Sequence, residues 1–175
     1  MIDWGEAEAK GGKQYKDYAP HGVHTVKVEK VDIHRLDSGS VAEDFHFAED
    51  DYQYPKSTHW LSFGNDNFRF LHQRNLMMVL GASKEDAQKA VEDCESKSGE
   101  DAKIKAYQQT FDRLLQKKPT VEIETHTSER NPKYDDAEFT APSVRFDNSK
   151  KKNEDPMSGA VELTTNETQN LEIPF

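Results

Sequence analysis

Cysteine and long apolar runs are scarce in this sequence, and each scarcity excludes a class of protein. Cys94 is the one cysteine, which excludes an internal disulfide and does not favour a cysteine-bound metal cluster. No stretch approaches the ~20 apolar residues that a membrane-spanning helix needs. Residues 1–6 lack the basic start and apolar run of a secretory signal. These features predict a cytoplasmic protein with no membrane partner.

Positive charge is also in short supply. The chain has 23 basic against 33 acidic residues, for a formal net charge of -10. Phosphate contacts need local positive charge, so this balance argues against a protein that is basic all over. It still permits a basic groove on an acidic body. With 34% hydrophobic and 32% charged residues, part of the 175-residue chain is expected to lie outside a single folded core.

Alternation of apolar residues predicts a long first strand over residues 22–36. The apolar residues keep one phase up to Val28 and the opposite phase from Val31. A strand whose phase changes midway has a bulge or a sharp bend, here near Glu29-Lys30. The alternative is two short strands joined by a turn, but no Gly, Pro or Asn interrupts the segment. We therefore favour one bent strand.

The rest of the body alternates between strand and helix patterns. Further strands are predicted at 43–49, 57–64, 121–126 and 138–146, and helices at 68–80, 84–95 and 99–117. The helix over 68–80 is apolar nearly all round and is expected to be buried, with Gly81 ending it. Ser83, with Asp86 three residues later, is a good N-cap for the next helix.

These patterns predict a mainly β protein of the α+β class. Five strands with a helical element between the third and the fourth form the OB arrangement, so we expect a five-stranded OB-type barrel over residues 21–146. Its helical insert spans about 67–118. Residues 1–20 are expected to be a polar arm, with Trp4, Tyr15 and Tyr18 as candidate anchors onto the domain. Residues 147–175 are too polar to offset the entropy of folding and are expected to be a flexible tail.

The C-terminus ends in Glu172, Ile173, Pro174 and Phe175. This ending resembles the tip of bacterial single-stranded DNA-binding proteins, which docks replication and repair enzymes. The resemblance implies that these four residues bind partner proteins of replication or recombination. An apolar pocket flanked by Lys or Arg can take the terminal ring and carboxylate together. The family's run of aspartates is replaced here by residues 164–170, and the alternative is that the tip docks back on its own domain.

The body resembles small phage-encoded single-stranded DNA-binding proteins of the OB type. The similar stretches are Ile2-Asp3-Trp4, residues 22–31, Val79-Leu80-Gly81 and residues 121–124. The resemblance implies a non-catalytic protein that coats single-stranded DNA during phage replication or recombination in the cytoplasm of a bacterial host. A homo-oligomer, with a dimer favoured, is a separate expectation.

Sequence-tolerant binding of a single strand needs aromatic faces for the bases and cations for the phosphates. In OB domains strands 2 and 3 and the flanking loops supply them. The predicted DNA-binding residues are Trp60, Tyr52, Tyr54, Lys27, Lys30, Arg35, Lys56, Arg130, Lys133 and Tyr134. Each has a structural alternative: Trp60 could cap a sheet edge, and the lysines could be solvated surface. Phe45 and Phe47, as a same-phase pair, are expected in the core, and Arg69 and Arg74 are expected to be structural.

Motifs of catalysis and of metal binding are not found. The seven histidines do not form a His-Glu-x-x-His or similar ligand pattern, and we expect them at the surface or half-buried. No phosphate-binding glycine loop or nucleophile elbow occurs, so we expect no cofactor, metal or enzymatic activity. Two rival functions stay open. A virion structural protein would self-associate and ignore DNA, and an acidic DNA mimic would carry carboxylates on one face.

Overall fold

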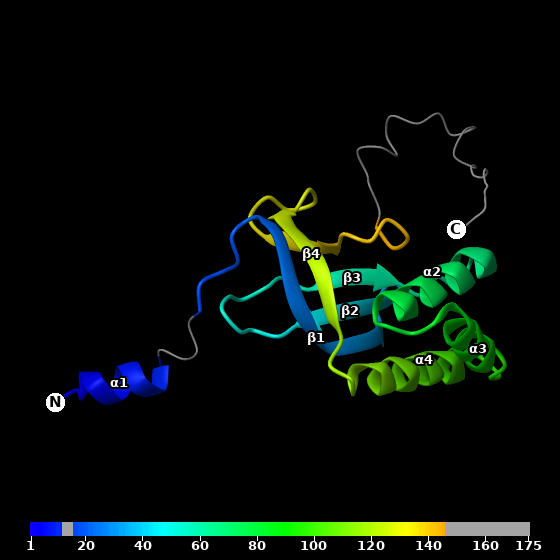
Figure 1. Cartoon of the computed structure of the whole chain (residues 1–175), viewed down its shortest axis with the longest axis horizontal. Coiled ribbons are helices and arrows are strands. Elements are labelled where there is room, and N and C mark those ends of the chain that lie inside the picture. Colours follow the sequence, from blue (N-terminus) through cyan, green and yellow to red (C-terminus); the bar gives the residue numbers. More distant parts are fainter. Residues whose placement is uncertain (12–15, 146–175) are drawn as a thin grey trace. The chain divides into compact units, whose positions relative to one another are not determined.

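The computed structural model describes residues 1–11 and 16–145, and one compact unit spans Met1–Val144. The expectations for the tail over 147–175, its tip included, lie outside these residues. The described chain is α+β, with a five-stranded antiparallel sheet and four helices (Figure 1). In order, the elements are α1 (Trp4–Gly11), β1 (Gly22–Arg35), β2 (Val41–Phe47), β3 (Ser57–Trp60), α2 (Asp66–Val79), α3 (Lys84–Glu95), α4 (Glu100–Leu115), β4 (Thr120–Thr127) and β5 (Asp135–Phe139).

The sheet has the strand order β3-β2-β1-β4-β5, and every neighbouring pair is antiparallel. Strand β1 serves both halves, because residues 22–27 pair with β4 and residues 28–35 pair with β2. The register shifts between Val28 and Lys30, so Glu29 is the extra residue of a bulge. The bent first strand is thereby confirmed at the predicted place.

The two edge strands of the sheet approach each other. The ring of Phe139 in β5 stacks on the imidazole of His59 in β3, with centroids 5.3 Å apart. Within the described part of the chain, however, no backbone ladder joins β3 to β5, and the sheet is open. A closed barrel is therefore not confirmed, while the five antiparallel strands and the helical insert between β3 and β4 are.

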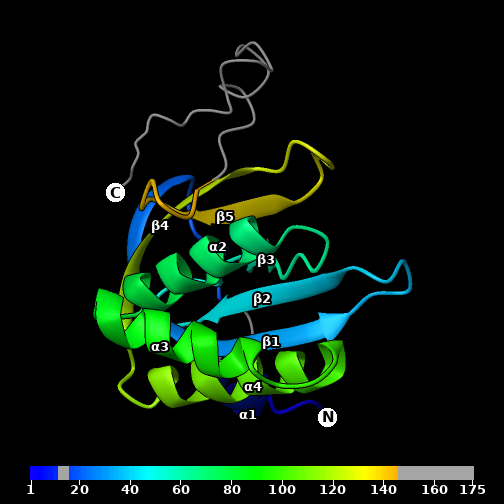
Figure 2. The ribbon, with the colours of Figure 1, turned by 90° about the vertical axis from the view of Figure 1, so that its right-hand side faces the viewer.

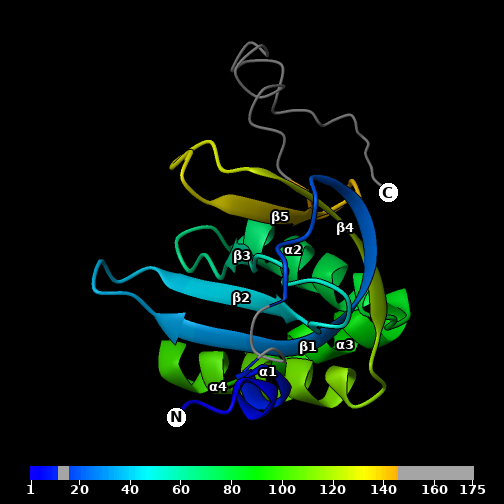
Figure 3. The same ribbon diagram turned by 90° about the vertical axis from the view of Figure 1, so that its left-hand side faces the viewer.

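The core lies between the inner face of this sheet and helices α2, α3 and α4. Figure 2 has these helices in front of the strands, and Figure 3, from the opposite side, has the strands in front. The ring of Phe45 is fully buried and contacts the rings of Phe111 and Phe139 edge-on, with centroids 5.7 and 5.3 Å away. Phe45 and Phe47 are both core residues, as expected.

Local signals define the ends of the helices in the insert. The side chain of Asn65 accepts a hydrogen bond from the Phe68 amide at the start of α2, and Ser83 accepts one from the Asp86 amide at the start of α3. Gly81 follows α2 with a φ of 106°, which a residue with a side chain rarely adopts. The predicted cap and the predicted helix end are both confirmed.

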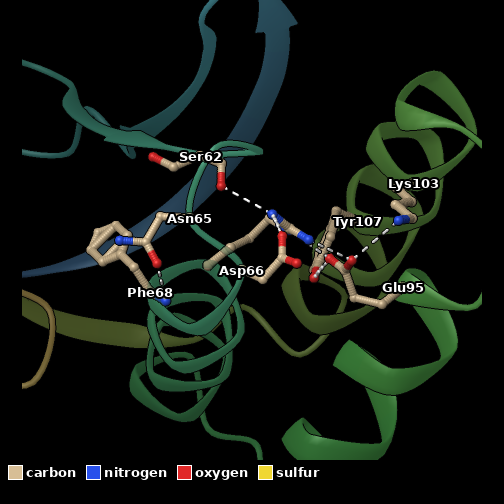
Figure 4. A network of polar contacts seen from close by, with 8 residues as sticks. Ser62, Asn65, Asp66, Phe68, Glu95, Lys103 and Tyr107 are labelled. Carbon is tan, nitrogen blue, oxygen red and sulfur yellow. Dashed lines mark hydrogen bonds and ion pairs between the residues drawn. The ribbon is translucent and has the colours of Figure 1, made fainter.

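A buried arginine joins the three helices of the insert to the end of β3. Arg69 of α2 donates from Nε and Nη2 to the Glu95 carboxylate of α3, at 2.9 and 2.8 Å, and from Nη1 to the Ser62 carbonyl at 3.0 Å. Tyr107 of α4 donates its hydroxyl to Glu95 at 2.6 Å, and Lys103 lies 3.5 Å from the same carboxylate (Figure 4). Arg69 is structural, as expected.

Helix α2 differs from the expectation of a helix buried all round. Its core-facing side carries the polar residues Arg69, His72 and Gln73, while Leu71 and Met78 are 52% and 37% exposed. The polar residues are buried because the core itself holds polar partners for them. Leu76 and Met77 are fully buried as expected, but the prediction that the helix is buried on all sides is wrong.

The N-terminal arm also differs. Residues 4–11 form helix α1, and the side chains of Trp4 and Tyr18 are exposed, so neither is an anchor. Tyr15 lies outside the described residues. Residues 16–19 instead attach through the backbone: Gln53 donates its amide to the Asp17 carbonyl, and Ala19 donates its amide to the Gln53 carbonyl, both at 2.9 Å. The third strand ends early, at Trp60, and the fifth both begins and ends early, at Asp135 and Phe139; turns follow at residues 63–64 and 142–144.

Candidate functional site

The outer face is the side of β1, β2 and β3 that points away from helices α2, α3 and α4 (Figure 3). Side chains of a strand alternate between the two faces, and the inner face is marked by its buried apolar residues. The outer face therefore carries Lys30, Asp32 and His34 of β1, Ala42, Asp44 and His46 of β2, and Thr58 and Trp60 of β3.

Trp60 and His34 lie in one row across this face. Ala42 on the central strand pairs with His34 on one side and with Trp60 on the other. Its methyl group is only 3% exposed, which shows that larger side chains cover it, whereas the Trp60 indole is half-buried. The alternation of β3 thus places Trp60 away from the core, with an apolar floor beside it.

A carboxylate at the centre of the outer face is already compensated. Asp44 Oδ2 lies 3.1 Å from Lys56 Nζ, and Asp44 Oδ1 accepts a hydrogen bond from the Thr58 hydroxyl at 2.6 Å. His34 Nε2 lies 3.8 Å away. Burial alone would raise the pKa of Asp44, but the contacts with Thr58, Lys56 and His34 outweigh it and lower that pKa. Asp44 therefore holds Lys56 in place.

Lys30 lies next to His46 on the same face, since the two residues are cross-strand partners. The Lys30 side chain is exposed and His46 is half-buried. The outer face thus combines the indole of Trp60 with the cations Lys30 and Lys56 and with two cross-strand carboxylates, Asp32 and Asp44.

Two loops extend from the same end of the sheet, the β1–β2 turn and the β4–β5 loop (Figures 2 and 3). The β4–β5 loop carries Arg130, Lys133 and Tyr134, all exposed. The loop is ordered by its own backbone, because the Ser128 amide donates to the Tyr134 carbonyl at 2.8 Å. These three predicted residues are therefore accessible on a defined loop.

Tyr52 and Tyr54 are not open stacking platforms. Both rings lie edge-on to the imidazole of His24, with centroids 6.1 and 5.5 Å from it, and 6.4 Å from each other. Burial raises the pKa of Tyr54, as do the charges of Asp51 and Asp50. The two tyrosines form a packed cluster at the start of β1, apart from the row of Trp60.

Arg35 and Lys27 also lie away from the centre of the outer face. Arg35 turns towards α4, where its Nη2 lies 3.1 Å from Glu100 and 3.4 Å from Asp101. Lys27 is exposed on the part of β1 that pairs with β4, before the bend. Of the ten predicted residues, the structure brings together only Trp60, Lys30 and Lys56 on one face.

Sequence reasoning missed three residues of this face, His34, Ala42 and Asp44. The period-2 alternation that placed Trp60 could have assigned them to the same side, because each stands in phase with it on its own strand. What the alternation could not supply is the register, which makes Ala42 the neighbour of both His34 and Trp60.

The outer surface of β4 and β5 is acidic. Glu122, Glu124, Asp136 and Glu138 alternate with the buried residues of these strands. His126 lies among them, with Nε2 2.9 Å from a Glu138 oxygen. Burial lowers the pKa of His126, but hydrogen bonds to Thr127 and Glu138 and the nearby negative charges outweigh it and raise that pKa.

Within residues 1–11 and 16–145, no group of three or more His, Cys, Asp or Glu side chains is arranged to hold a metal ion. In the same part of the chain, every helix is too short or too polar to cross a membrane. No protein-family model matches the sequence, and no curated protein is significantly similar to it.

Proposed function

We propose that this protein is a non-catalytic single-stranded DNA-binding protein built on an OB-type barrel. In this proposal the outer face of β1, β2 and β3 holds the strand, and the protein keeps DNA unpaired during phage replication or recombination in a bacterial host cell. The proposal names single-stranded DNA, and no cofactor, as the ligand.

The sheet topology supports the OB-type barrel. OB folds are five-stranded and partly open, and they bind oligonucleotides on the face of strands 2 and 3 beside the 1–2 and 4–5 loops. Here a long bent β1 is shared by β2 and β4, a helical insert separates β3 from β4, and the edges β3 and β5 meet at His59 and Phe139.

The observation that carries the proposal is the pairing of Trp60 with cations on the outer face. Stacking of a base on an aromatic ring is sequence-tolerant and worth ~1–3 kcal/mol. Lys30 and Lys56 stand on the same side of the sheet to contact phosphates, each four residues along the chain from the row of His34, Ala42 and Trp60. The acidic surface of β4 and β5 repels a polyanion. In this proposal that repulsion restricts the DNA strand to the outer face of β1, β2 and β3.

The test is a fluorescence-anisotropy titration of a labelled poly-dT strand of roughly 30 nucleotides, with a duplex of equal length beside it. We expect binding to the strand that weakens with salt, and little binding to the duplex. Trp60→Ala should weaken binding by about 5- to 100-fold, the equivalent of ~1–3 kcal/mol of stacking.

Two lysine substitutions distinguish a specific phosphate contact from the effect of overall charge. Lys30→Ala should lower the slope of log K against log salt by about 0.7, the value for one phosphate contact on a single strand. Lys89→Ala removes the same charge from the exposed side of α3 and should leave the slope unchanged. Equal effects of the two substitutions, or no binding by the unaltered protein at low salt, would reject the proposal.

The C-terminal tip enters the proposal as a partner-binding segment. Glu172, Ile173, Pro174 and Phe175 lie outside the described residues, and their role rests on the resemblance of the tip alone. Removing residues 147–175 should leave DNA affinity equal or tighter and abolish recruitment of replication or recombination proteins. A truncated protein that no longer binds DNA would contradict the assignment of DNA binding to the folded body and of partner binding to the tip. A homo-oligomer, with a dimer favoured, stays a prediction.

The acidic surface of β4 and β5 favours a second candidate, a DNA mimic that blocks a DNA-binding protein. Its carboxylates Glu122, Glu124 and Asp136 stand on one face, as a mimic requires. The same titration separates the two functions, because a mimic has no affinity for the strand and loses its function when these carboxylates are replaced by amides.

A further inference from the structure

Strand β1 and helix α4 enclose an open groove of about 530 Å³. The groove is lined by His34 and Arg35 of β1 and by Asp101, Ile104, Lys105 and Gln108 of α4. Its position is set by the bend of β1, because β4 pairs only with residues 22–27 and leaves the later part of that edge to α4.

Gln108 makes the inner wall of the groove rigid. Its Nε2 donates to the Val31 carbonyl at 2.8 Å, and its Oε1 accepts from the Ile33 amide at 2.9 Å. The side-chain amide thus occupies the backbone edge that another strand would otherwise use. This wall of the groove is therefore formed before a ligand binds.

The polar lining of the groove is cationic on two sides. Arg35 projects from β1, and Lys105 is exposed on α4. Asp101 opposes them, and Arg35 Nη2 lies 3.4 Å from it and 3.1 Å from Glu100. The Asp101 side chain is 96% exposed. Ion pairs that are this exposed contribute little, so a phosphate can replace the carboxylates as the partner of Arg35.

His34 connects the groove to the outer face. It lines the groove, and it also lies in the row of Ala42 and Trp60, with its Nε2 3.8 Å from Asp44. A strand that stacks on Trp60 and passes over Ala42 therefore reaches the mouth of the groove at His34, without crossing the acidic surface of β4 and β5.

We propose that the β1–α4 groove is a second subsite for the same DNA strand, in which Arg35 and Lys105 hold a phosphate and Ile104 contacts the sugar or base. This inference rests on the proposed function and adds the path of the strand beyond the outer face. It assigns Lys105, which lies far from the other predicted residues in the sequence, to DNA binding.

The length dependence of binding tests the subsite. Affinity of the full chain is measured for poly-dT strands from about 4 to about 20 nucleotides, within the range of site sizes of OB domains. We expect affinity to rise in two stages, as strands first cover the outer face and then reach the groove. Lys105→Ala should remove the second stage only, with a loss of about 5- to 10-fold for the longest strands at low salt and a salt slope lower by about 0.7.

Matched variants separate a site from general electrostatics. Lys105→Arg should retain the second stage, and Asp101→Asn should strengthen it, because the competing carboxylate is gone. Lys89→Ala on α3 should change neither stage. Trp60→Ala should weaken the binding of poly-dT strands of all lengths.

The outcomes for the subsite and for the proposed function are distinguishable. If long strands bind the unaltered protein and Lys105→Ala has no more effect than Lys89→Ala, the subsite is wrong while single-strand binding stands. If strands of no length bind, the proposed function fails, and the subsite fails with it. A loss confined to long strands in Lys105→Ala supports both.

Discussion

Glu43 lies in the interior on the inner face of β2, beside residues that belong to the core. Its Oε1 accepts a hydrogen bond from Gln73 Nε2 at 2.6 Å. The other oxygen of Glu43 and the amide oxygen of Gln73 are buried without a hydrogen-bond partner. An ionised carboxylate has no donor to offer, whereas a protonated one does. Burial raises the pKa of Glu43 to about 8, so the neutral acid is the form present near neutral pH.

His59 and His72 form a second buried polar pair. Their facing nitrogens, Nδ1 of His59 and Nε2 of His72, lie 3.2 Å apart, and the Ser57 hydroxyl lies 3.1 Å from His59 Nε2. Burial lowers the pKa of His59 to about 3, with a contribution from His72, and burial lowers the pKa of His72 to about 4. The expectation that all histidines lie at the surface or half-buried is wrong for these two.

These three groups predict how stability depends on pH. The raised pKa of Glu43 means that stability falls as pH rises from 4.5 to about 8, because only the folded protein keeps the proton there. The lowered pKa values of His59 and His72 mean that stability falls as pH drops from 6.5 towards 4 and 3. Between pH 4.5 and 6.5 the rise in stability from the two histidines is larger than the fall from Glu43. The three groups together therefore predict that the protein is most stable near pH 6.5.

Urea unfolding of the unaltered protein and of Glu43→Gln, at pH values between 6.5 and 8, measures the contribution of Glu43 to the pH dependence of stability. The unaltered protein should lose about 1–2 kcal/mol across this range. The free energy of unfolding of Glu43→Gln, which cannot ionise at this position, should not show this fall. Parallel curves for the two proteins would mean that Glu43 is already ionised at pH 6.5.

At the scale of elements, the helical insert depends on the buried guanidinium of Arg69. It joins α2 to Glu95 of α3 and to the carbonyl of Ser62 after β3, and its Cζ lies 4.9 Å from the ring centroid of Phe63. The hydrogen bonds and charge of Glu95 raise the pKa of Arg69, so the guanidinium is charged throughout. Removing one member of a buried ion pair leaves the other uncompensated.

Arg69→Leu should therefore lower the free energy of unfolding by about 3–5 kcal/mol. Arg113→Gln, at an exposed position of α4, is the control and should change it by no more than ~0.5 kcal/mol. Denaturant unfolding compares the two. A loss below 1 kcal/mol for Arg69→Leu would mean that the packing of the helices, and not this ion pair, fixes the insert.

Elements that depend on local signals could be predicted from the sequence. The bulge near Glu29-Lys30 follows from a change of phase within one strand, and the start of α3 follows from Ser83. Features that depend on distant partners could not be predicted. Arg35 was assigned to the DNA face because nothing in the sequence indicates that α4 brings Glu100 to it, 65 residues away. The burial of His72 likewise requires β3 to bring His59 against α2.

At the scale of the whole molecule, the net charge of -10 is not evenly spread. The outer surface of β4 and β5 carries carboxylates, whereas on the outer face of β1, β2 and β3 the cations Lys30 and Lys56 balance the carboxylates Asp32 and Asp44. An acidic protein can therefore hold a polyanion on one side only. Such binding weakens with salt only modestly, because few cations carry it and each phosphate contact adds about 0.7 to the slope of log K against log salt.

The central claim is that the strand stacks on Trp60. The Trp4→Phe variant leaves Trp60 as the one tryptophan, because the chain has two. Its fluorescence is followed during a titration with poly-dT, and again with a duplex. The account predicts saturable quenching by the single strand that high salt reverses, and little change with the duplex. Binding detected by anisotropy without any change in Trp60 fluorescence, or no binding at all, would contradict it.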